Sequence, residues 1–323
     1  MHVIHKLPVL VLHVNNRCNC RCTMCSIWKS TDTSELTPET LSGYLPDMRT
    51  LGVESVALTG GEPLMHSRLS ELCSILKDAG IRVTILTTGL LLHRHAGMLV
   101  RLADEVIVSL DGPSAVHERI RRVAGCYELL ACGVRALHDI DPRFPVHGRC
   151  TVQRLNCSSL RATATSARSI GLQSISFLAA DLVSTAFNRG TGLTVIEGDG
   201  LALGLTDIQE LEREIAAIPE ADFTSGFVVE SREKLQRIVR HFRARLGLAE
   251  PVAPRCNAPW VSGVIETDGL LRPCFFHEGI GRADSSGFLA ALNGPAALEF
   301  RSRLVVADDS MCRRCVCSLW RPN

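Results

Sequence analysis

The sequence lacks a charge excess of either sign, a long apolar run and any low-complexity segment. A formal net charge of +1 over 323 residues gives no electrostatic footprint for nucleic-acid binding. No apolar run approaches the roughly 18 residues of a membrane span. The short apolar run near the N-terminus is interrupted by His13 and has no small-residue cleavage site, so it does not indicate a signal peptide. We therefore expect a cytoplasmic protein with no membrane or nucleic-acid partner.

Cysteine is the residue that this chain has in excess. Seven of its 14 cysteines lie in two clusters, at residues 18–25 and 312–317. Disulfides are typical of small secreted chains, whereas clustered thiols in a reducing cytoplasm favour metal binding. The two clusters therefore predict two metal centres, one at each end of the chain.

The first cluster lies in the segment Asn-Asn-Arg-Cys-Asn-Cys-Arg-Cys-Thr-Met-Cys, just after the apolar residues 9–12. Cys18, Cys22 and Cys25 have the spacing C-x3-C-x2-C, and Cys20 falls outside it. Three thiolates leave a fourth position open, as a catalytic metal needs, whereas structural zinc is closed by four protein ligands. Thiolates select iron–sulfur clusters, zinc or Cu(I). A zinc knuckle or a group of buried thiols is the alternative interpretation.

Strand-like and helix-like segments alternate along the chain. Thr37-Pro38 predicts a helix start, and Pro46 is expected to kink that helix or divide it. Short strands joined by helices indicate parallel strands with right-handed crossovers. We therefore expect an α/β fold, a partial (β/α)6 barrel of the TIM type. The predicted strands are 9–14, 53–58, 81–87, 105–110, 146–152 and 174–178. The predicted helices are 38–51, 67–79, 91–102, 158–169, 206–218 and 230–246, with further helical pattern up to about residue 138.

Three regions are expected from these patterns. They are the barrel over residues 1–190, a helical linker region over 191–254 and a small cysteine-rich domain over 255–323. The last region has many glycines and little helical periodicity. Its cysteines, Cys256 with Cys274 and Cys312 with Cys315, are enough for one four-thiolate centre, and Cys317 lies close behind. Composition does not separate zinc from iron–sulfur at that centre.

The first cysteine loop resembles the cluster motif of the radical S-adenosylmethionine (SAM) enzymes. The resemblance implies that Cys18, Cys22 and Cys25 bind a [4Fe–4S] cluster whose fourth iron chelates SAM. It further implies that one-electron reduction cleaves SAM to a 5′-deoxyadenosyl radical, with a flavodoxin or ferredoxin as the electron donor. Cys20 has no place in the pattern, and Met24 stands where the family often has an aromatic residue.

Other segments resemble the family's SAM contacts. Gly60, Gly61, Glu62 and Pro63 match the Gly-Gly-Glu-Pro segment that binds the SAM amino group, and adjacent glycines let backbone groups approach a ligand closely. The remaining matches are Ser109 in Ser-Leu-Asp-Gly, which faces SAM in the family, and Asn156 and Leu178, at positions that often touch ribose and adenine. Thr88 stands where many relatives have asparagine.

The C-terminal pattern C-x(9–15)-G-x4-C resembles the auxiliary-cluster domains called SPASM and twitch. The later cysteines of a full SPASM domain are missing, so the resemblance implies a twitch-type domain with one auxiliary [4Fe–4S] cluster. Its expected ligands are Cys256, Cys274, Cys312 and Cys315, with Cys317 as a substitute for the last.

These resemblances predict a radical SAM enzyme that abstracts hydrogen from a small polar substrate, in dehydrogenation or epimerisation of a sugar or aminocyclitol. A peptide maturase of the SPASM group is the second hypothesis, and a non-catalytic metal-binding scaffold is the third. Epimerisation requires a hydrogen donor, and Cys150 on the strand 146–152 is the candidate thiol. Strand alternation places either His147, Arg149 and Thr151 or Gly148, Cys150 and Val152 on the inner face.

Overall fold

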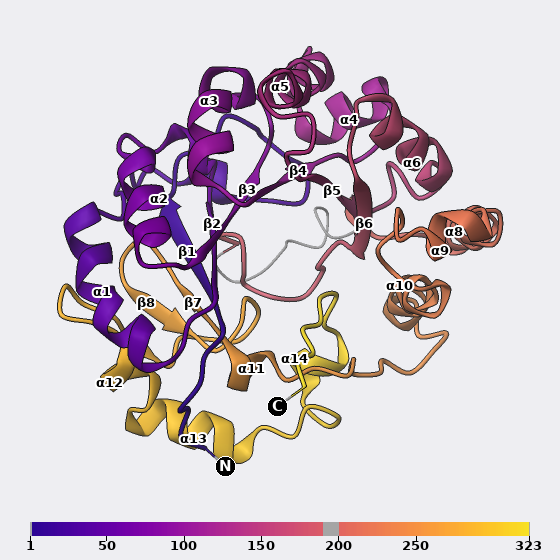
Figure 1. Ribbon diagram of the computed structural model, residues 1–323. Coiled ribbons are helices and arrows are strands. Elements are labelled where there is room, and N and C mark those ends of the chain that lie inside the picture. The colour runs from indigo at the N-terminus through magenta and orange to yellow at the C-terminus, as the bar shows by residue number, and fades with distance from the viewer. Residues whose placement is uncertain (1, 190–199, 323) are drawn as a thin grey trace.

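The computed structural model describes residues 2–189 and 200–322 and shows an open, curved sheet ringed by helices (Figure 1). The described strands form one sheet in the order β6-β5-β4-β3-β2-β1-β7-β8-β9, and β1 to β7 pair in parallel. The sheet does not close, so the predicted partial barrel is confirmed. The strands are β1 (Val9–Asn15), β2 (Ser55–Gly60), β3 (Arg82–Thr87), β4 (Glu105–Ser109), β5 (Val146–Val152), β6 (Ser174–Ala179), β7 (Ser262–Ile265), β8 (Leu270–Arg272) and β9 (Gly281–Arg282).

The helices lie outside the sheet, and the predicted helices agree with the observed ones to within about two residues at each end. Thr37 caps α1, where its hydroxyl accepts a hydrogen bond from the Thr40 amide at 3.1 Å. Pro46 lies inside α1 without dividing it, so of the two expected effects the division does not occur. The first helices are α1 (Pro38–Thr50), α2 (Leu69–Asp78), α3 (Leu92–Leu102), α4 (Ser114–Arg121), α5 (Cys126–Ile140) and α6 (Leu160–Ser169), with the 3-10 turns η1 (Ile27–Lys29) and η2 (Pro63–Met65).

The region after β6 continues the ring of helices. Contacts join α8 to α6 and α10 to β6, and Val228 forms a parallel bridge with Ile175 of β6. The expected boundary between residues 190 and 191 lies outside the described residues. The later helices are α8 (Leu205–Ala216), α9 (Glu220–Thr224), α10 (Arg232–Arg245), α11 (Ala258–Val261), α12 (Leu289–Leu292), α13 (Pro295–Arg303) and α14 (Ser310–Arg313).

The C-terminal region joins the barrel sheet through β7, which pairs with β1 from Val9 to Leu12. The strand β8 then pairs antiparallel with β7, and β9 pairs antiparallel with β8. Periodicity did not predict these strands because β7 has four residues, β8 three and β9 two. The pairing places the C-terminal cysteine region on the β1 side of the barrel. No helix in the described part of the chain has the length and hydropathy needed to cross a membrane.

Alternating residues of each barrel strand face the helices or the hollow of the sheet. On β5, Gly148, Cys150 and Val152 are buried, whereas Arg149 and Thr151 are half-buried. Residues facing the helices become fully buried, so the half-buried set is the inner face. Candidate functional groups are therefore expected on the second set and at the carboxyl ends of the strands.

Candidate functional site

The cysteine loop follows β1 at the carboxyl edge of the sheet. Burial raises the pKa of the Cys18 thiol to about 12 and that of Cys25 to about 11, and the neighbouring Cys22 contributes to both increases. The Cys20 amide donates a hydrogen bond to Cys18 Sγ at 3.5 Å, and the Ile27 amide donates one to Cys25 Sγ at 3.5 Å. The three thiols are thus close together, only partly solvated and provided with donors that favour thiolate. This donor set fits a cluster with one open position.

Cys22 differs from the other two thiols because it has a cation beside it. Its pKa is lowered, mainly by the hydrogen bond from the Cys20 thiol and then by the Arg121 guanidinium. Arg121 Nη1 lies 3.3 Å from Cys22 Sγ, and Arg121 Nη2 lies 2.6 Å from the Asp111 carboxylate. Asp111 is fully buried and also accepts a hydrogen bond from the Thr151 amide at 2.9 Å. An ion pair from α4 and the end of β4 therefore supports one cysteine of the loop.

The Gly60-Gly61 pair lies against the start of the cysteine loop. A Cβ on Gly60 would come within 2.3 Å of the Asn15 carbonyl oxygen, and one on Gly61 within 2.0 Å of the Arg17 carbonyl oxygen. The Gly61 amide donates to the Asn15 carbonyl at 2.8 Å, and the Glu62 amide donates to the Arg17 carbonyl at 2.7 Å. Glycine is thus required at both positions because residues 15–17 pass too close for a side chain. This close contact fixes the ends of β1 and β2 against each other.

Glu62 is fully buried, and its carboxylate already has donors within the chain. It accepts hydrogen bonds from the Thr87 hydroxyl at 2.6 Å, the Thr88 amide at 2.6 Å and the Leu64 amide at 3.0 Å. Burial raises the pKa of Glu62, against the lowering effect of these donors. The Thr88 hydroxyl continues the network to Asn19 Oδ1 at 3.0 Å. Glu62 therefore ties the ends of β2 and β3 to the cysteine loop.

The other predicted SAM contacts occupy two different environments. Ser109 and Leu178 are half-buried near the carboxyl ends of β4 and β6, and strand pairing places them on the same face as Arg149 and Thr151. Asn156 is fully buried, and its amide nitrogen donates to the Asp111 carbonyl at 2.9 Å and the Thr151 carbonyl at 3.1 Å. Ser109 and Leu178 line the inner face of the sheet, whereas Asn156 binds the backbone at Asp111 and Thr151.

Sequence reasoning missed several residues around the cysteine loop. Arg189 is buried; it forms an ion pair with Asp181 at 2.6 Å and donates to the Met24 carbonyl at 2.6 Å. The Ser26 amide donates to the carbonyl of Phe187, a residue with φ of 63°. The positive φ values of Phe187 and Asn188, at two consecutive non-glycine positions, were not visible in the sequence. Arg121 lies in α4, shortly after the Asp-Gly turn, and no signal in the sequence indicated that it lies beside Cys22.

The C-terminal thiols form a second group. Cys256, Cys274 and Cys315 are partly buried. In addition to burial, the charges of Cys256 and Cys274 raise the pKa of Cys312 and Cys315, and the charge of Cys317 raises that of Cys274 and Cys315. Burial is the main cause of the raised pKa of Cys312, which reaches about 12. Cys317 is exposed, and its carbonyl accepts a hydrogen bond from the Cys315 thiol at 2.7 Å. The expected auxiliary cysteines are therefore brought together, with Cys317 at the edge.

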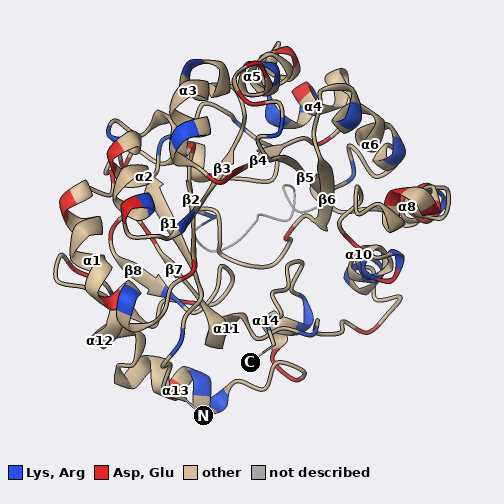
Figure 2. Ribbon diagram, viewed as in Figure 1, with Lys and Arg blue, Asp and Glu red and all other residues tan. Residues whose placement is uncertain are grey.

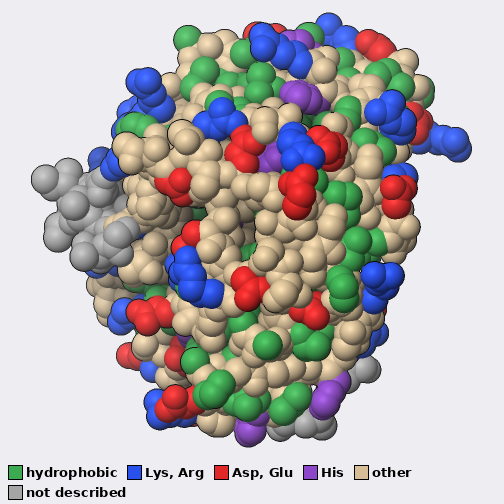
Figure 3. Space-filling view, turned by 90° about the vertical axis from the view of Figure 1, so that its left-hand side faces the viewer, with side chains coloured by type: hydrophobic (Ala, Val, Ile, Leu, Met, Phe, Trp, Pro, Cys, Tyr) green, Lys and Arg blue, Asp and Glu red, His purple; other side chains and the backbone are tan. Residues whose placement is uncertain are grey.

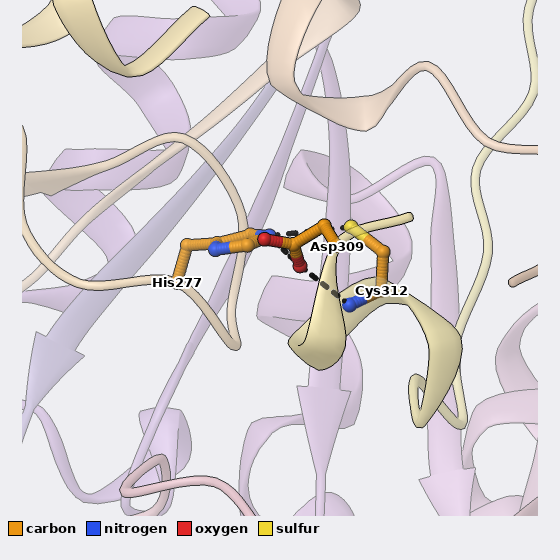
Figure 4. Close-up of side chains that lie close together, drawn as sticks. All are labelled: His277, Asp309 and Cys312. Atoms are coloured by element: carbon orange, nitrogen blue, oxygen red, sulfur yellow. Dashed lines mark hydrogen bonds and ion pairs between the residues drawn. The ribbon is translucent and has the colours of Figure 1, made fainter. Parts of the chain in front are cut away.

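A histidine not singled out from the sequence lies beside this group. Figure 4 shows His277 directed toward Asp309 and Cys312 at the start of α14. His277 Nε2 lies 3.3 Å from Cys312 Sγ and 3.7 Å from Asp309 Oδ1, and Asp309 accepts from the Cys312 amide at 2.8 Å. Ligand atoms of these three side chains lie within 4.8 Å of one another. The imidazole thus lies beside both the Cys312 thiol and the Asp309 carboxylate that caps α14.

Comparison with known proteins identifies the N-terminal half of this arrangement. The sequence model described as "Radical SAM superfamily" matches residues 12–151, which span the cysteine loop, the Gly-Gly-Glu-Pro segment and the end of β4. Residues 12–151 of the chain therefore match the radical SAM superfamily. Members of this superfamily use a [4Fe–4S] cluster and SAM.

Two curated relatives and one solved structure illustrate how far the similarity extends. The AdoMet-dependent heme synthase of Methanosarcina barkeri (strain Fusaro / DSM 804) is 30% identical over 159 residues, 48% of this chain and 45% of that relative. The chain thus matches less than half the length of that protein. A probable GTP 3′,8-cyclase of Metallosphaera sedula (strain ATCC 51363 / DSM 5348 / JCM 9185 / NBRC 15509 / TH2) is 26% identical over 296 residues, 85% of this chain and 82% of the relative. Streptococcus suis SuiB bound to precursor peptide SuiA has a TM-score of 0.68 at 13% identity, covering 98% of this chain and 72% of SuiB. The last similarity shows that this chain shares the fold of SuiB.

The buried ion pair beside Cys22 gives a first prediction. Arg121→Met leaves Asp111 buried without a counter-ion, so we expect the free energy of unfolding to fall by about 3–5 kcal/mol. The variant is also expected to bind less iron at the N-terminal site, because Cys22 loses the cation that favours its thiolate. Thermal unfolding of anaerobically reconstituted protein and iron analysis measure the two effects. The Arg121→Met/Asp111→Asn double variant should recover part of the lost stability, and equal melting temperatures for wild type and Arg121→Met would contradict this account.

Proposed function

We propose that this chain reductively cleaves SAM and abstracts hydrogen from a small polar substrate, in dehydrogenation or epimerisation of a sugar or aminocyclitol type. The observation that carries the proposal is the loop of three close thiols at the carboxyl end of β1, with Arg121 supporting Cys22. When bound, the cluster and SAM supply a 5′-deoxyadenosyl radical. The residues of the chain bind and orient these groups and exclude water around them.

Cys18, Cys22 and Cys25 are the proposed ligands of the SAM-binding cluster. Their thiols share one loop, and burial at this edge of the sheet keeps water away from them. Cys20 has a different role in the proposal, because its thiol donates a hydrogen bond to Cys22. A flavodoxin or ferredoxin is the proposed electron donor.

The SAM contacts are proposed at the segment Gly60–Pro63, at Ser109 and at Leu178. The Glu62 carboxylate is occupied by three internal donors, so backbone groups of the segment are better placed than this side chain to meet an ammonium group. Asn156 is proposed to act indirectly, by holding Asp111 and Thr151 at the carboxyl ends of β4 and β5.

The inner face of the barrel favours a polar substrate. Glu105 accepts a hydrogen bond from the Thr84 hydroxyl at 2.7 Å, and His147 Nδ1 lies 2.9 Å from the Ser174 hydroxyl. Arg149 lies nearer the carboxyl edge, and its buried Nε has no hydrogen-bond partner among residues 2–189 and 200–322. A guanidinium nitrogen of this kind is available to a hydroxyl or carboxylate of a substrate. The names of the curated relatives, a heme synthase and a GTP cyclase, also favour a small molecule.

A peptide maturase is the second candidate function. It is favoured by the fold shared with SuiB, whose structure holds the precursor peptide SuiA. Both candidate functions begin with cleavage of SAM, so the first assay is the same for both. Anaerobically reconstituted protein given dithionite and SAM should release 5′-deoxyadenosine, and a chain that releases none with both clusters loaded would be a non-catalytic scaffold. Mass shifts in candidate small molecules or peptides then separate the two enzyme functions.

The C-terminal thiols are proposed to hold an auxiliary [4Fe–4S] cluster through Cys256, Cys274, Cys312 and Cys315. In addition to burial, the charges of Cys256 and Cys274 raise the pKa of both Cys312 and Cys315, which supports a common site. Four thiolates satisfy either an iron–sulfur cluster or a zinc ion. His277 holds the Cys312 side chain in the proposal, and it is within reach of the same site.

Cys150 gives a second prediction, which concerns the end of the reaction. The thiol is fully buried on the face of β5 that packs against the helices, and the Asn156 amide donates to its Sγ at 3.5 Å. A thiol that returns hydrogen to a substrate has to face it, so we expect Cys150 to be inaccessible. Iodoacetamide should label the exposed Cys132 in the native protein and leave Cys150 unmodified until the protein unfolds, as measured by mass spectrometry. Labelling of Cys150 at a rate similar to Cys132 would instead favour the hydrogen-donor role.

A further inference from the structure

A cavity outside the three-thiol loop lies between α10 and the C-terminal segment. Its volume is about 1050 Å³. One wall is α10, the opposite wall consists of residues 251–255 and 313–320, and Leu182 and Val183 reach it from the end of β6. Cys315, one of the proposed auxiliary ligands, also lines it. The cavity therefore adjoins both the mouth of the barrel and the C-terminal thiols.

Its lining is strongly basic although the whole chain is nearly neutral. Cationic side chains reach it from both walls: Lys234, Arg237 and Arg240 from α10, and Arg255, Arg313 and Arg314 from the C-terminal segment. Among the described lining residues, Glu233 is the single carboxylate. Figure 2 shows the corresponding blue segments on α10 and near α14. By contrast, on the α1–α2 face shown in Figure 3 opposite charges are interspersed, as where Arg68 pairs with Glu39 and Glu71.

Internal partners account for only part of this charge. Arg313 pairs with Glu250 at 3.3 Å, and Arg240 Nε donates to the Glu250 carbonyl at 3.1 Å. Arg255 lies over the Trp320 ring at 3.9 Å, which leaves its charge uncompensated. Arg237 is half-buried at the centre of the α10 wall, and within residues 2–189 and 200–322 its guanidinium has no hydrogen bond or ion pair. Lys234, Arg240, Arg255 and Arg314 are exposed, and like charges that lie side by side repel one another unless an anion joins them.

Neutralisation of an auxiliary cluster does not explain so many cations. A cluster held by four thiolates has a small net negative charge, which about one or two cations would balance. The basic residues also extend along α10 and to Arg255, rather than surrounding the thiols alone. The remaining charge is matched to a ligand that brings several negative charges of its own.

We propose that this cavity binds the anionic part of the substrate, and that the substrate carries two or more phosphate or carboxylate groups. The inference rests on the proposed function, because the anion is the substrate only if the chain catalyses that reaction. Arg237 and Arg240 are the proposed anion contacts from α10, and Arg255 with Trp320 forms a cationic and aromatic wall opposite them. Guanidinium groups suit this task because their paired N–H donors match carboxylate and phosphate oxygens.

The test is a calorimetric titration of the anaerobically reconstituted full chain with inorganic pyrophosphate and, separately, with tricarballylate. We expect saturable binding that weakens as salt rises, and an at least tenfold weaker affinity in Arg237→Gln. Arg237→Lys should recover part of the affinity, which separates loss of charge from misfolding. Arg213→Gln is the matched control, because this arginine of α8 pairs with Glu210 and does not line the cavity. Tighter binding of pyrophosphate would indicate a phosphate ligand, and tighter binding of tricarballylate would indicate a carboxylate ligand.

Three results would overturn the proposal: no saturable binding of either probe by wild type, equal weakening in Arg213→Gln, or unchanged affinity in Arg237→Gln. If Arg237→Gln shifts the reduction potential of the auxiliary cluster and leaves probe binding unchanged, these cations serve the cluster alone. The titration requires neither SAM nor turnover, so it can fail in a protein that releases 5′-deoxyadenosine and succeed in one that does not. Failure of the anion site and failure of the proposed function are thereby distinguishable.

Discussion

Replacing Cys18, Cys22 or Cys25 with alanine, one at a time, is expected to abolish release of 5′-deoxyadenosine. Each variant leaves two thiolates on a loop where three are needed, and no other thiol of the loop is free to take the vacant position. Cys20 is the nearest alternative, but its side chain is fully buried and its thiol is hydrogen-bonded to Cys22. The measurement is anaerobic turnover with dithionite and SAM, together with iron content.

Cys20 provides the matched control for this experiment. Cys20→Ala should retain most SAM cleavage, with some loss of stability because it leaves a small cavity in the core. Cys20→Ser should lose less, since its hydroxyl keeps a donor for the Cys22 thiolate. A loss in Cys20→Ala as complete as that in Cys22→Ala would contradict the assignment and make Cys20 a ligand.

The strands of the barrel and their order were predictable from the sequence because each βα unit buries a continuous apolar strand under an amphipathic helix. Segments such as 83–87 and 106–109 are rich in β-branched residues, which favours a strand over a helix. The short strands β7, β8 and β9 were not predictable, because a segment as short as Ser262–Ile265 has too few residues to show a period. Their place beside β1 is fixed by tertiary pairing alone.

The site was predictable in outline and not in its contacts. Spacing predicted that Cys18, Cys22 and Cys25 share a loop, and they do. Spacing could not show that Glu62 and Asn156 are consumed by internal hydrogen bonds, since both residues have the chemistry of a ligand contact. Nor could it show Arg121 beside Cys22, because the two are 99 positions apart. Contacts of this kind depend on which strand ends meet, and only the folded chain decides that.

The second large effect concerns iron at the two ends of the chain. Fully reconstituted wild type is expected to contain about eight irons, from two [4Fe–4S] clusters. The Cys18/Cys22/Cys25→Ala triple variant should keep about four, held by the C-terminal thiols. Cys256→Ala combined with Cys274→Ala should keep about four at the other site, and still release 5′-deoxyadenosine. Iron and acid-labile sulfide analysis gives the counts, and Mössbauer spectroscopy gives the cluster type.

The same measurement decides which thiol completes the C-terminal site. Cys315 is partly buried and within reach of the charges of Cys256 and Cys274, whereas Cys317 is exposed and meets Cys315 through its carbonyl. In the background of the triple variant, Cys315→Ala should therefore lose the remaining iron, and Cys317→Ala should keep it. The opposite pattern would exchange their roles. One equivalent of zinc in place of the remaining iron would make the C-terminal centre structural, because zinc has no redox chemistry and a four-thiolate shell leaves it no open position.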